Sequence, residues 1–394
     1  MTGVLNGVRV VDFCRYIAGP FCTALLADLG ADVIRIERVD GSEDRYTAPI
    51  APDGSGAGFM QMNRNKKSVT LNPMKPEGQA IVRKLVATAD IVAANLPPAT
   101  LLRMGIDYDT LRTIKPDIIF TTMNAFGAGG PYADRVGFDG IGQAMSGSVY
   151  LGGTPEQPVK SFAPYADYGT ASLACAGTLA ALLHRNQTGQ GQKVEASLAR
   201  TALAFNNPML LEQAAIKPNR IGTLNRAQTI APADIFKAKD GWFISQVIGP
   251  VLFARWCKLV GAEEWLDDPR FANDLARGEN GELVTQRMNA WSAQRTVDEV
   301  VSLMEAARIP CGPVLSPQQA LDDPHFQSAG MFAPTQYPGM EEPLPLADIP
   351  VRLSATPGGI RQRPPTLGEH TSAVLGALGY SVAELAELRE KRVI

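Results

Sequence analysis

Histidine and cysteine are scarce in this sequence, with three histidines and five cysteines among 394 residues. The cysteines stand at irregular spacings, mostly within apolar segments, and their number is odd. This pattern argues against a disulfide framework, and the few histidines argue against a zinc site. We therefore expect buried free thiols and no bound metal. The cysteines are Cys14, Cys22, Cys175, Cys257 and Cys311.

An excess of one charge is also missing, as are long hydrophobic runs. The formal net charge of −3 is small and of the wrong sign for a protein that binds nucleic acid or an anionic membrane surface. No apolar stretch reaches the roughly 18 to 20 residues that cross a bilayer, and residues 1–13 contain no basic segment followed by an apolar core. We expect a cytoplasmic protein with no nucleic-acid or membrane partner.

The first third of the chain alternates between short β-branched runs and segments with helical spacing. Residues 8–13 and 31–37 are strand-like, and residues 19–30 between them have the apolar spacing of a helix. These three segments make one right-handed βαβ unit. The cycle repeats with strands within 67–72, 90–96 and 117–127, and with helices at 76–88 and near Leu101. The alternation predicts a doubly wound α/β domain with a parallel sheet.

The pattern changes after this domain. Residues 170–184 have almost no polar side chains, which predicts a helix buried on all sides, and residues 188–198 predict a turn followed by a strand. Residues 234–247 predict a hairpin with Asp-Gly at its turn. We expect a smaller α+β domain over 225–325, and we interpret the Pro-rich segment 307–326 as an extended linker.

One edge of the predicted sheet has weak signs of a nucleotide site. The first strand-to-helix junction has only Ala18-Gly19-Pro20 where a dinucleotide-binding protein has GxGxxG, so a plain helix start explains it equally well. Glu37 and Arg38 end the second strand, where open α/β folds bind ligands. Glu37 would suit a ribose hydroxyl and Arg38 a ribose phosphate. The alternative is a solvated charge pair at a strand end.

Cations near other strands of the sheet suggest a ligand with several phosphates, because charge-assisted contacts to phosphate are stronger than neutral ones. Solvent-exposed surface is still the commoner place for any one of them. The cations are Arg64, Lys66, Lys67 and Arg103.

A single carboxylate, Asp167, stands between Tyr165 and Tyr168 where the apolar helix would begin. Aspartate is among the best N-cap residues, and the local pattern favours that interpretation. The same position would suit an anionic nucleophile, because the N-terminus of a helix stabilises negative charge. With its ordinary pKa of about 3.9, an aspartate is almost wholly ionised at neutral pH and needs no partner base.

Six motifs occur in a fixed order along nearly the whole chain. They are VVDFCRYIAGPFCTALLADLGADVIRIER, NRNKKSVTLN followed by PEG, NLPPATLLRMG, NAFGAGGPYADRVGFDGIGQAMSG, ADYGTA and TGQGQKVEASL. In order and spacing they resemble the class III CoA-transferases, the CaiB/BaiF family, which includes formyl-CoA, succinyl-CoA and carnitine CoA-transferases. Six ordered motifs are a much stronger sign than one short pattern.

The resemblance implies a Rossmann-like large domain built from both ends of the chain and a smaller α+β domain from its middle. It also implies two chains threaded through each other as an interlocked homodimer. On this basis we expect the CoA-binding large domain over 1–200 plus 330–394, with linkers at 201–224 and 326–340.

The resemblance further implies a transferase that moves CoA from an acyl-CoA thioester, its substrate, to a free carboxylic acid, without a tightly bound cofactor. Asp167 matches the family's nucleophilic aspartate, and N–H groups at Tyr168 and Gly169 would stabilise the oxyanion. The matching positions for CoA are Arg38, Asn95, Leu96, Arg103 and Arg135, with Ala18 near the pantetheine end. The candidate substrate-binding residues are Phe138, Asp139 and Tyr168.

Two departures from the family pattern bear on the reaction. The formyl-CoA transferases have a glycine run as a flap, whereas SQVIGPVLF offers only Gly249, which puts oxalate and formate in doubt. The racemase branch has a histidine where this chain has Phe138, so racemisation of 2-methylacyl-CoA is the weaker alternative. An NADP-dependent oxidoreductase, resting on Arg38, and a non-catalytic CoA-binding protein are the alternatives from other classes.

Overall fold

The computed structural model describes residues 3–394, which divide into two compact units. The first unit comprises residues 1–146, 161–207 and 324–394, of which the first two residues are not described. The second unit comprises residues 147–160 and 208–323. Each unit has its own hydrophobic core. No helix among the described residues is both long enough and apolar enough to cross a membrane.

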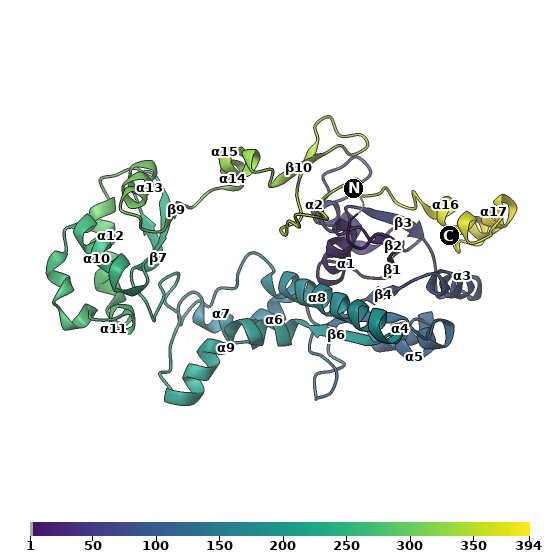
Figure 1. Cartoon of the computed structure of the whole chain (residues 1–394), viewed down its shortest axis with the longest axis horizontal. Coiled ribbons are helices and arrows are strands. Elements are labelled where there is room, and N and C mark those ends of the chain that lie inside the picture. The colour runs from purple at the N-terminus through teal and green to yellow at the C-terminus, as the bar shows by residue number, and fades with distance from the viewer. Residues whose placement is uncertain (1–2) are drawn as a thin grey trace. The chain divides into compact units, whose positions relative to one another are not determined.

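A six-stranded parallel sheet forms the centre of the first unit (Figure 1). The strands lie in the order β3-β2-β1-β4-β5-β6, so the chain winds outward in both directions from a switch point between β1 and β4. This sheet confirms the predicted α/β fold. The strands are β1 (Arg9–Asp12), β2 (Asp32–Glu37), β3 (Lys66–Thr70), β4 (Ile91–Ala94), β5 (Ile119–Asn124) and β6 (Lys193–Ser197).

Helices cover both faces of this sheet, which explains why its central strands are continuous apolar runs rather than alternating ones. On one face, α1 (Ala18–Asp28) and α8 (Tyr165–Thr188) share a core with the strands. The helices on the other face are α3 (Pro76–Ala87), α4 (Pro98–Met104), α5 (Tyr108–Ile114), α16 (Thr371–Ala377) and α17 (Val382–Glu390) (Figure 1). All five cysteines are free thiols, and all but Cys311 are buried.

Helix α8 differs from the expectation of burial on all sides. Its small residues Ala174 and Ala181 pack into the core that it shares with α1, where the absence of long side chains permits close approach. Leu173 and Leu183, however, are 49% and 60% exposed. Apolar composition alone predicted burial, but within this chain only one face of the helix is covered.

The second unit is built around a small antiparallel sheet. Strands β7 (Ala233–Lys237) and β8 (Trp242–Gln246) form the predicted hairpin, and β9 (Cys311–Pro313) pairs with β8. Trp256 is fully buried in the core of this unit. The helices here are α7 (Ser148–Leu151), α10 (Gly249–Val260), α11 (Asp274–Glu279), α12 (Gly281–Ser292), α13 (Val297–Ala306) and α14 (Pro317–Asp322), with 3₁₀ turns at Glu263–Leu266 and Pro269–Phe271.

Segments interpreted as linkers contain regular structure. Helix α9 (Leu198–Ile216) continues through residues 201–216, and α14 begins with a capping box at Ser316 inside the segment expected to be extended. The sequence signal for the capping box, Ser-x-x-Gln, outweighs the prolines there. The remaining elements are the 3₁₀ turn Glu43–Tyr46, α2 (Ala57–Met62), α6 (Asp139–Met145), α15 (Pro324–Ser328), β10 (Phe332–Thr335) and β11 (Leu344–Ala347).

Candidate active site

A pocket of 1140 Å³ opens at the carboxyl ends of β1, β4 and β5, within the first unit. This is the switch point of the sheet, where doubly wound folds bind their ligands. Its volume suits a large organic ligand. The predicted site residues that line it are Ala18, Asn95, Leu96, Arg135, Phe138 and Asp167.

The turn between β1 and α1 forms one wall of the pocket. Asn95, which follows β4, accepts a hydrogen bond from the Arg15 N–H at 2.7 Å and donates one to the Arg15 carbonyl at 2.7 Å. Its side-chain amide thus pairs with the backbone of the turn as a neighbouring strand would. Asn95 therefore fixes this wall in addition to facing the pocket.

Two predicted CoA-binding arginines do not line the pocket. Arg38 is exposed and forms an ion pair with Glu43, which does line the pocket. Arg103 is exposed on α4, with its Nη2 3.9 Å from the sulfur of Met74.

The structure excludes a ribose-binding role for Glu37. This side chain is fully buried at the end of β2, where its carboxylate accepts hydrogen bonds from Arg45 at 2.5 and 3.0 Å and from Ser68 at 2.7 Å. With both oxygens engaged inside the protein, the carboxylate cannot reach a ligand. The position at a strand end was predicted correctly, but the direction of the side chain was not.

The phosphate-binding interpretation is also wrong for Arg64 and Lys66, the two buried cations at β3. Arg64 and Lys66 are fully buried and form ion pairs with Asp28 at 2.6 Å and Asp12 at 2.9 Å. Lys67 pairs with Asp32 at 2.5 Å. A buried cation requires a partner of opposite charge. Arg64 and Lys66 are therefore paired inside the protein and are not available to phosphate, whereas the side chain of Lys67 is 37% exposed.

Asp167 lies in the first turn of α8, but it is not the helix cap. The N-cap position belongs to Pro164, which has no side-chain hydrogen bond to offer. Asp139, from the start of α6, takes that role because its Oδ1 accepts from the Ala166 N–H at 2.9 Å and the Asp167 N–H at 3.2 Å. Gln143 donates to Asp139 Oδ2 at 2.5 Å. The capping interpretation of Asp167 is therefore wrong. Its carboxylate does not bind the N–H groups at the start of α8.

Asp167 lines the pocket, and its carboxylate has no hydrogen-bond partner within residues 3–394. Burial, followed by the nearby charge of Asp139, raises the pKa of Asp167 to about 7. The two effects outweigh the stabilisation of an anion by the N-terminus of α8. The carboxyl group therefore keeps its proton to a higher pH than an ordinary aspartate, which differs from the expectation of an almost wholly ionised group.

The aromatic residues predicted for the substrate lie in two places. Phe138 packs edge-on against Tyr16 in the pocket wall, with ring centroids 5.5 Å apart. Tyr168 does not line the pocket, and its ring packs edge-on against Phe21 at 4.9 Å. The N–H of Tyr168 donates to the Pro164 carbonyl at 3.1 Å, so it is not available as the expected oxyanion donor.

Arg15, which is not among the predicted site residues, lines the pocket beside Tyr16. Its Nη1 donates to the carbonyls of Phe13, Cys14 and Ile36 at 3.2, 2.8 and 3.1 Å. Within residues 3–394 no carboxylate forms an ion pair with this guanidinium. Burial, followed by the charge of Arg35, lowers the pKa of Arg15. The available signal was an arginine shortly after the end of the first strand, at the switch point of the predicted sheet.

Comparison with protein families and curated proteins points to one family. A family model described as CoA-transferase family III matches residues 5–371. A succinyl-CoA–D-citramalate CoA-transferase of Chloroflexus aurantiacus is 34% identical over 394 residues, which cover 99% of this chain and 98% of that protein. A formyl-CoA:oxalate CoA-transferase of Streptomyces avermitilis is 32% identical over 420 residues and is covered completely, as is this chain.

Comparison with solved structures agrees with the family match. The crystal structure of a CaiB/BaiF family protein from Brucella suis has a TM-score of 0.84 with this chain and is 31% identical to it. The likeness covers 96% of this chain and 100% of that one. The two proteins thus share their architecture from end to end.

Proposed function

The chain belongs to CoA-transferase family III, and we propose that it moves CoA from an acyl-CoA thioester to a free carboxylic acid through a covalent intermediate on Asp167. The enzyme class is acyl-CoA:carboxylate CoA-transferase. The observation that supports the intermediate is the unpaired Asp167 carboxylate in the pocket at the switch point. An oxygen nucleophile of this kind needs only ionisation to become reactive.

The proposed reaction conserves the thioester through four acyl transfers. The ionised Asp167 oxygen attacks the thioester carbonyl, the C–S bond breaks, and an aspartyl-acyl anhydride and CoA thiolate result. The thiolate attacks the aspartyl carbonyl, which releases the first acid and leaves an aspartyl-CoA thioester. The incoming carboxylate attacks this thioester and forms a second anhydride with release of the thiolate. The thiolate then attacks the new acyl carbonyl, which restores the Asp167 carboxylate without consumption of ATP.

The oxyanions of these steps require hydrogen-bond donors. The N–H groups of Ala166 and Asp167 are bound to Asp139, and that of Tyr168 is bound within the helix. The start of α1 lines the same pocket through Ile17 and Ala18. Because the first N–H groups of a helix have no intrahelical acceptor, we assign oxyanion stabilisation to this helix end.

We further propose that CoA lies along the pocket, with Ala18 near its pantetheine and Asn95, Leu96 and Arg135 beside it. Arg38 and Arg103 have long exposed side chains near the pocket residues Glu43 and Leu101, from which they would turn toward the phosphates. Arg15 adds a cation inside the pocket itself. Residues 1–200 with 330–394 would form this CoA-binding domain, and residues 225–325 the smaller domain. No tightly bound cofactor enters the scheme.

Replacing Arg38 or Arg103 with alanine should raise the KM for the CoA thioester by about tenfold, because each change removes one charged contact to phosphate. Neither side chain fills core volume, so the free energy of unfolding should stay the same. Steady-state kinetics and urea unfolding measure both effects. Arg83, exposed on α3 and outside the pocket, gives a matched Arg→Ala control. A KM equal to that of the control would remove these arginines from the CoA site.

The acids are proposed from the relatives' names, which include succinyl-CoA–D-citramalate, succinate–glutarate and formyl-CoA:oxalate CoA-transferases. We propose a dicarboxylic acid on at least one side of the exchange. Incubation with succinyl-CoA and a panel of citramalate, glutarate, malate and oxalate, followed by mass analysis of CoA esters, tests this. Loss of deuterium from the α-carbon of a 2-methylacyl-CoA without acid exchange would instead support the racemase. No histidine lines the pocket formed by the described residues to serve that reaction.

We also propose the interlocked homodimer that the family resemblance implies. Apolar side chains on α8 and α9 support it, since Leu173, Leu183, Leu203 and Phe205 are 49%, 60%, 42% and 54% exposed. Threaded chains cannot separate without partial unfolding, so the protein should remain dimeric on dilution to nanomolar concentration. Light scattering and mass photometry report the mass, and the Asp167→Asn variant should behave identically. A monomer at any of these dilutions contradicts the interlocked arrangement.

A further inference from the structure

Tyr16, in the wall of the pocket, has a backbone conformation that L-residues rarely adopt. Its φ is 64°, in the left-handed region where Cβ crowds the following carbonyl. A large aromatic residue remains there only when its surroundings impose the conformation. A glycine would adopt this φ at no steric cost, yet the chain has tyrosine at this position. The contacts around Tyr16 must therefore hold it in this conformation.

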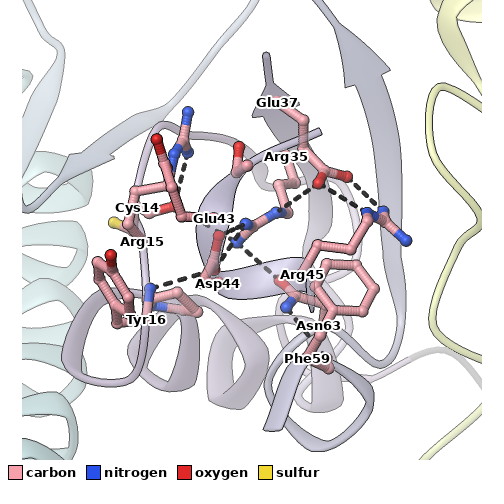
Figure 2. Close-up of polar contacts among 12 residues, drawn as sticks. Cys14, Arg15, Tyr16, Arg35, Glu37, Glu43, Asp44, Arg45, Phe59 and Asn63 are labelled. Atoms are coloured by element: carbon pink, nitrogen blue, oxygen red, sulfur yellow. Dashed lines mark hydrogen bonds and ion pairs between the residues drawn. The ribbon is translucent and has the colours of Figure 1, made fainter. Parts of the chain in front are cut away.

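Asp44 supplies the hydrogen bond that holds this conformation (Figure 2). Its Oδ2 accepts from the Tyr16 N–H at 3.1 Å, and the same carboxylate accepts from Arg35 Nη2 at 2.9 and 2.8 Å. Arg35 Nη1 donates in turn to the Cys14 carbonyl at 3.3 Å and to Asn63 Oδ1 at 3.0 Å. The guanidinium thus joins the residue two positions before Tyr16 to the carboxylate that binds Tyr16 itself.

These groups form a rigid and well-shielded support. Arg35 is fully buried, and Asp44 is 6% exposed. Glu37 lies 3.7 Å from Arg35 Nε and also binds the buried Arg45 (Figure 2). Because both members of the Arg35–Asp44 pair are removed from water, each depends on the other for its position. Asp44 does not line the pocket, and its hydrogen bond to a pocket residue is the one it accepts from the Tyr16 N–H.

The left-handed conformation of Tyr16 determines which groups of this turn line the pocket. It places the Tyr16 ring edge-on to Phe138, and it precedes Ile17 and Ala18, the start of α1. If Tyr16 returned to an ordinary φ, the ring and the first N–H groups of α1 would both change direction. The backbone before Tyr16 would stay in place, because Arg15 is held by Asn95 and by the three carbonyls that its guanidinium binds.

We propose that Asp44 is a positioning residue for CoA transfer, which holds Tyr16 in the left-handed conformation and so sets the pocket wall that faces Asp167. This rests on the proposed function. The Asp44→Asn variant keeps the shape of the side chain but offers one oxygen where Arg35 and Tyr16 need two. It should lower kcat/KM for the acyl-CoA by about tenfold, the scale expected of a small misplacement of binding groups. The dissociation constant of free CoA should rise with it.

The Tyr16→Gly substitution distinguishes a positioning role of Asp44 from a general structural role. Glycine adopts positive φ without help, whereas alanine removes the same ring but keeps the steric cost. We expect Asp44→Asn to cost about tenfold in the wild-type and Tyr16→Ala backgrounds and less than about twofold in the Tyr16→Gly background. Equal losses in all three backgrounds, or no loss in the wild type, overturn the proposal.

A second comparison leaves the Arg35–Asp44 pair intact. It therefore tests the proposal even if the Asp44→Asn variant does not fold. Tyr16→Val and Tyr16→Gly both remove the ring, but a β-branched residue resists positive φ. The valine variant should therefore bind free CoA about tenfold more weakly than the glycine variant, with urea unfolding confirming that both are folded. Equal affinities contradict the proposal. Calorimetry with free CoA requires no turnover. A failure of this prediction can therefore be distinguished from a failure of the covalent mechanism on Asp167.

Discussion

Replacing Asp167 with asparagine should abolish CoA exchange while leaving the fold and the binding of free CoA intact. The amide has nearly the same shape, and no hydrogen bond to the carboxylate is lost within residues 3–394. What disappears is the nucleophilic oxygen, and the loss of a nucleophile costs about a thousandfold or more in kcat. Exchange between an acyl-CoA and a labelled acid, followed by mass analysis, measures the effect.

A matched control and a trapping experiment accompany this variant. Asp134 is another pocket carboxylate, and Asp134→Asn should keep most of the activity. The wild type incubated with acyl-CoA and hydroxylamine should acquire a hydroxamate at Asp167 and at no other carboxylate, because hydroxylamine intercepts the aspartyl thioester. Substantial activity in the Asn variant, with deamidation excluded by mass, would falsify the covalent mechanism.

The same variant has a consequence for stability. Burial and Asp139 raise the pKa of Asp167 to about 7, whereas the unfolded chain has an ordinary value of 3.8. The native state thus binds more protons between these values, so the wild type loses stability as the pH rises from about 4 to about 7. Asparagine has no proton to lose. The variant should therefore unfold at a higher urea concentration than the wild type at pH 8, with a smaller difference at pH 4.

The sheet could be predicted because its pattern is local. The apolar runs that became β1 and β2, with a helix between them, allow one arrangement of a right-handed βαβ unit. The switch point, and with it the site, follows from that winding. Asn95 follows β4 and Ala18 begins α1, so both lie at the carboxyl edge of the sheet and line the pocket there.

Side-chain direction could not be predicted, because the partners come from distant parts of the chain. Lys66 is buried because Asp12 lies across the sheet from it, 54 positions earlier. Glu37 points inward because Arg45 and Ser68 hold it there. Nothing within a few residues of Lys66 or Glu37 distinguishes a buried ion pair from a ligand-binding charge.

The role of Asp167 illustrates the same limit. Its local pattern is that of an N-cap, and the cap is instead supplied by Asp139, 28 positions earlier. Only the folded chain brings this second carboxylate to the start of α8. Asp139 takes the cap position from Asp167, and its charge adds to the larger effect of burial in raising the pKa of the Asp167 carboxyl group.

The pH dependence of catalysis should show the raised pKa of Asp167 beside Asp139. If the ionised Asp167 is the nucleophile, kcat/KM for the acyl-CoA should rise with pH and level off above an apparent pKa of about 7, the value set by burial and by Asp139. Only about a tenth of the enzyme would be active at pH 6 and about nine-tenths at pH 8. A direction opposite to this would mean that the protonated carboxyl group is the reactive form.

The Asp139→Asn variant separates the two causes of the raised pKa. Asparagine retains an oxygen that can accept from the Ala166 and Asp167 N–H groups, but it removes the like charge. The rising limb of the profile should therefore move to lower pH, so that the variant is relatively more active than the wild type at pH 6 than at pH 8. Asp134→Asn, which changes the pocket charge away from this pair, should leave the limb in place. A limb that stays at pH 7 in the Asp139 variant would mean that burial alone sets the pKa and that Asp139 serves only as the cap of α8.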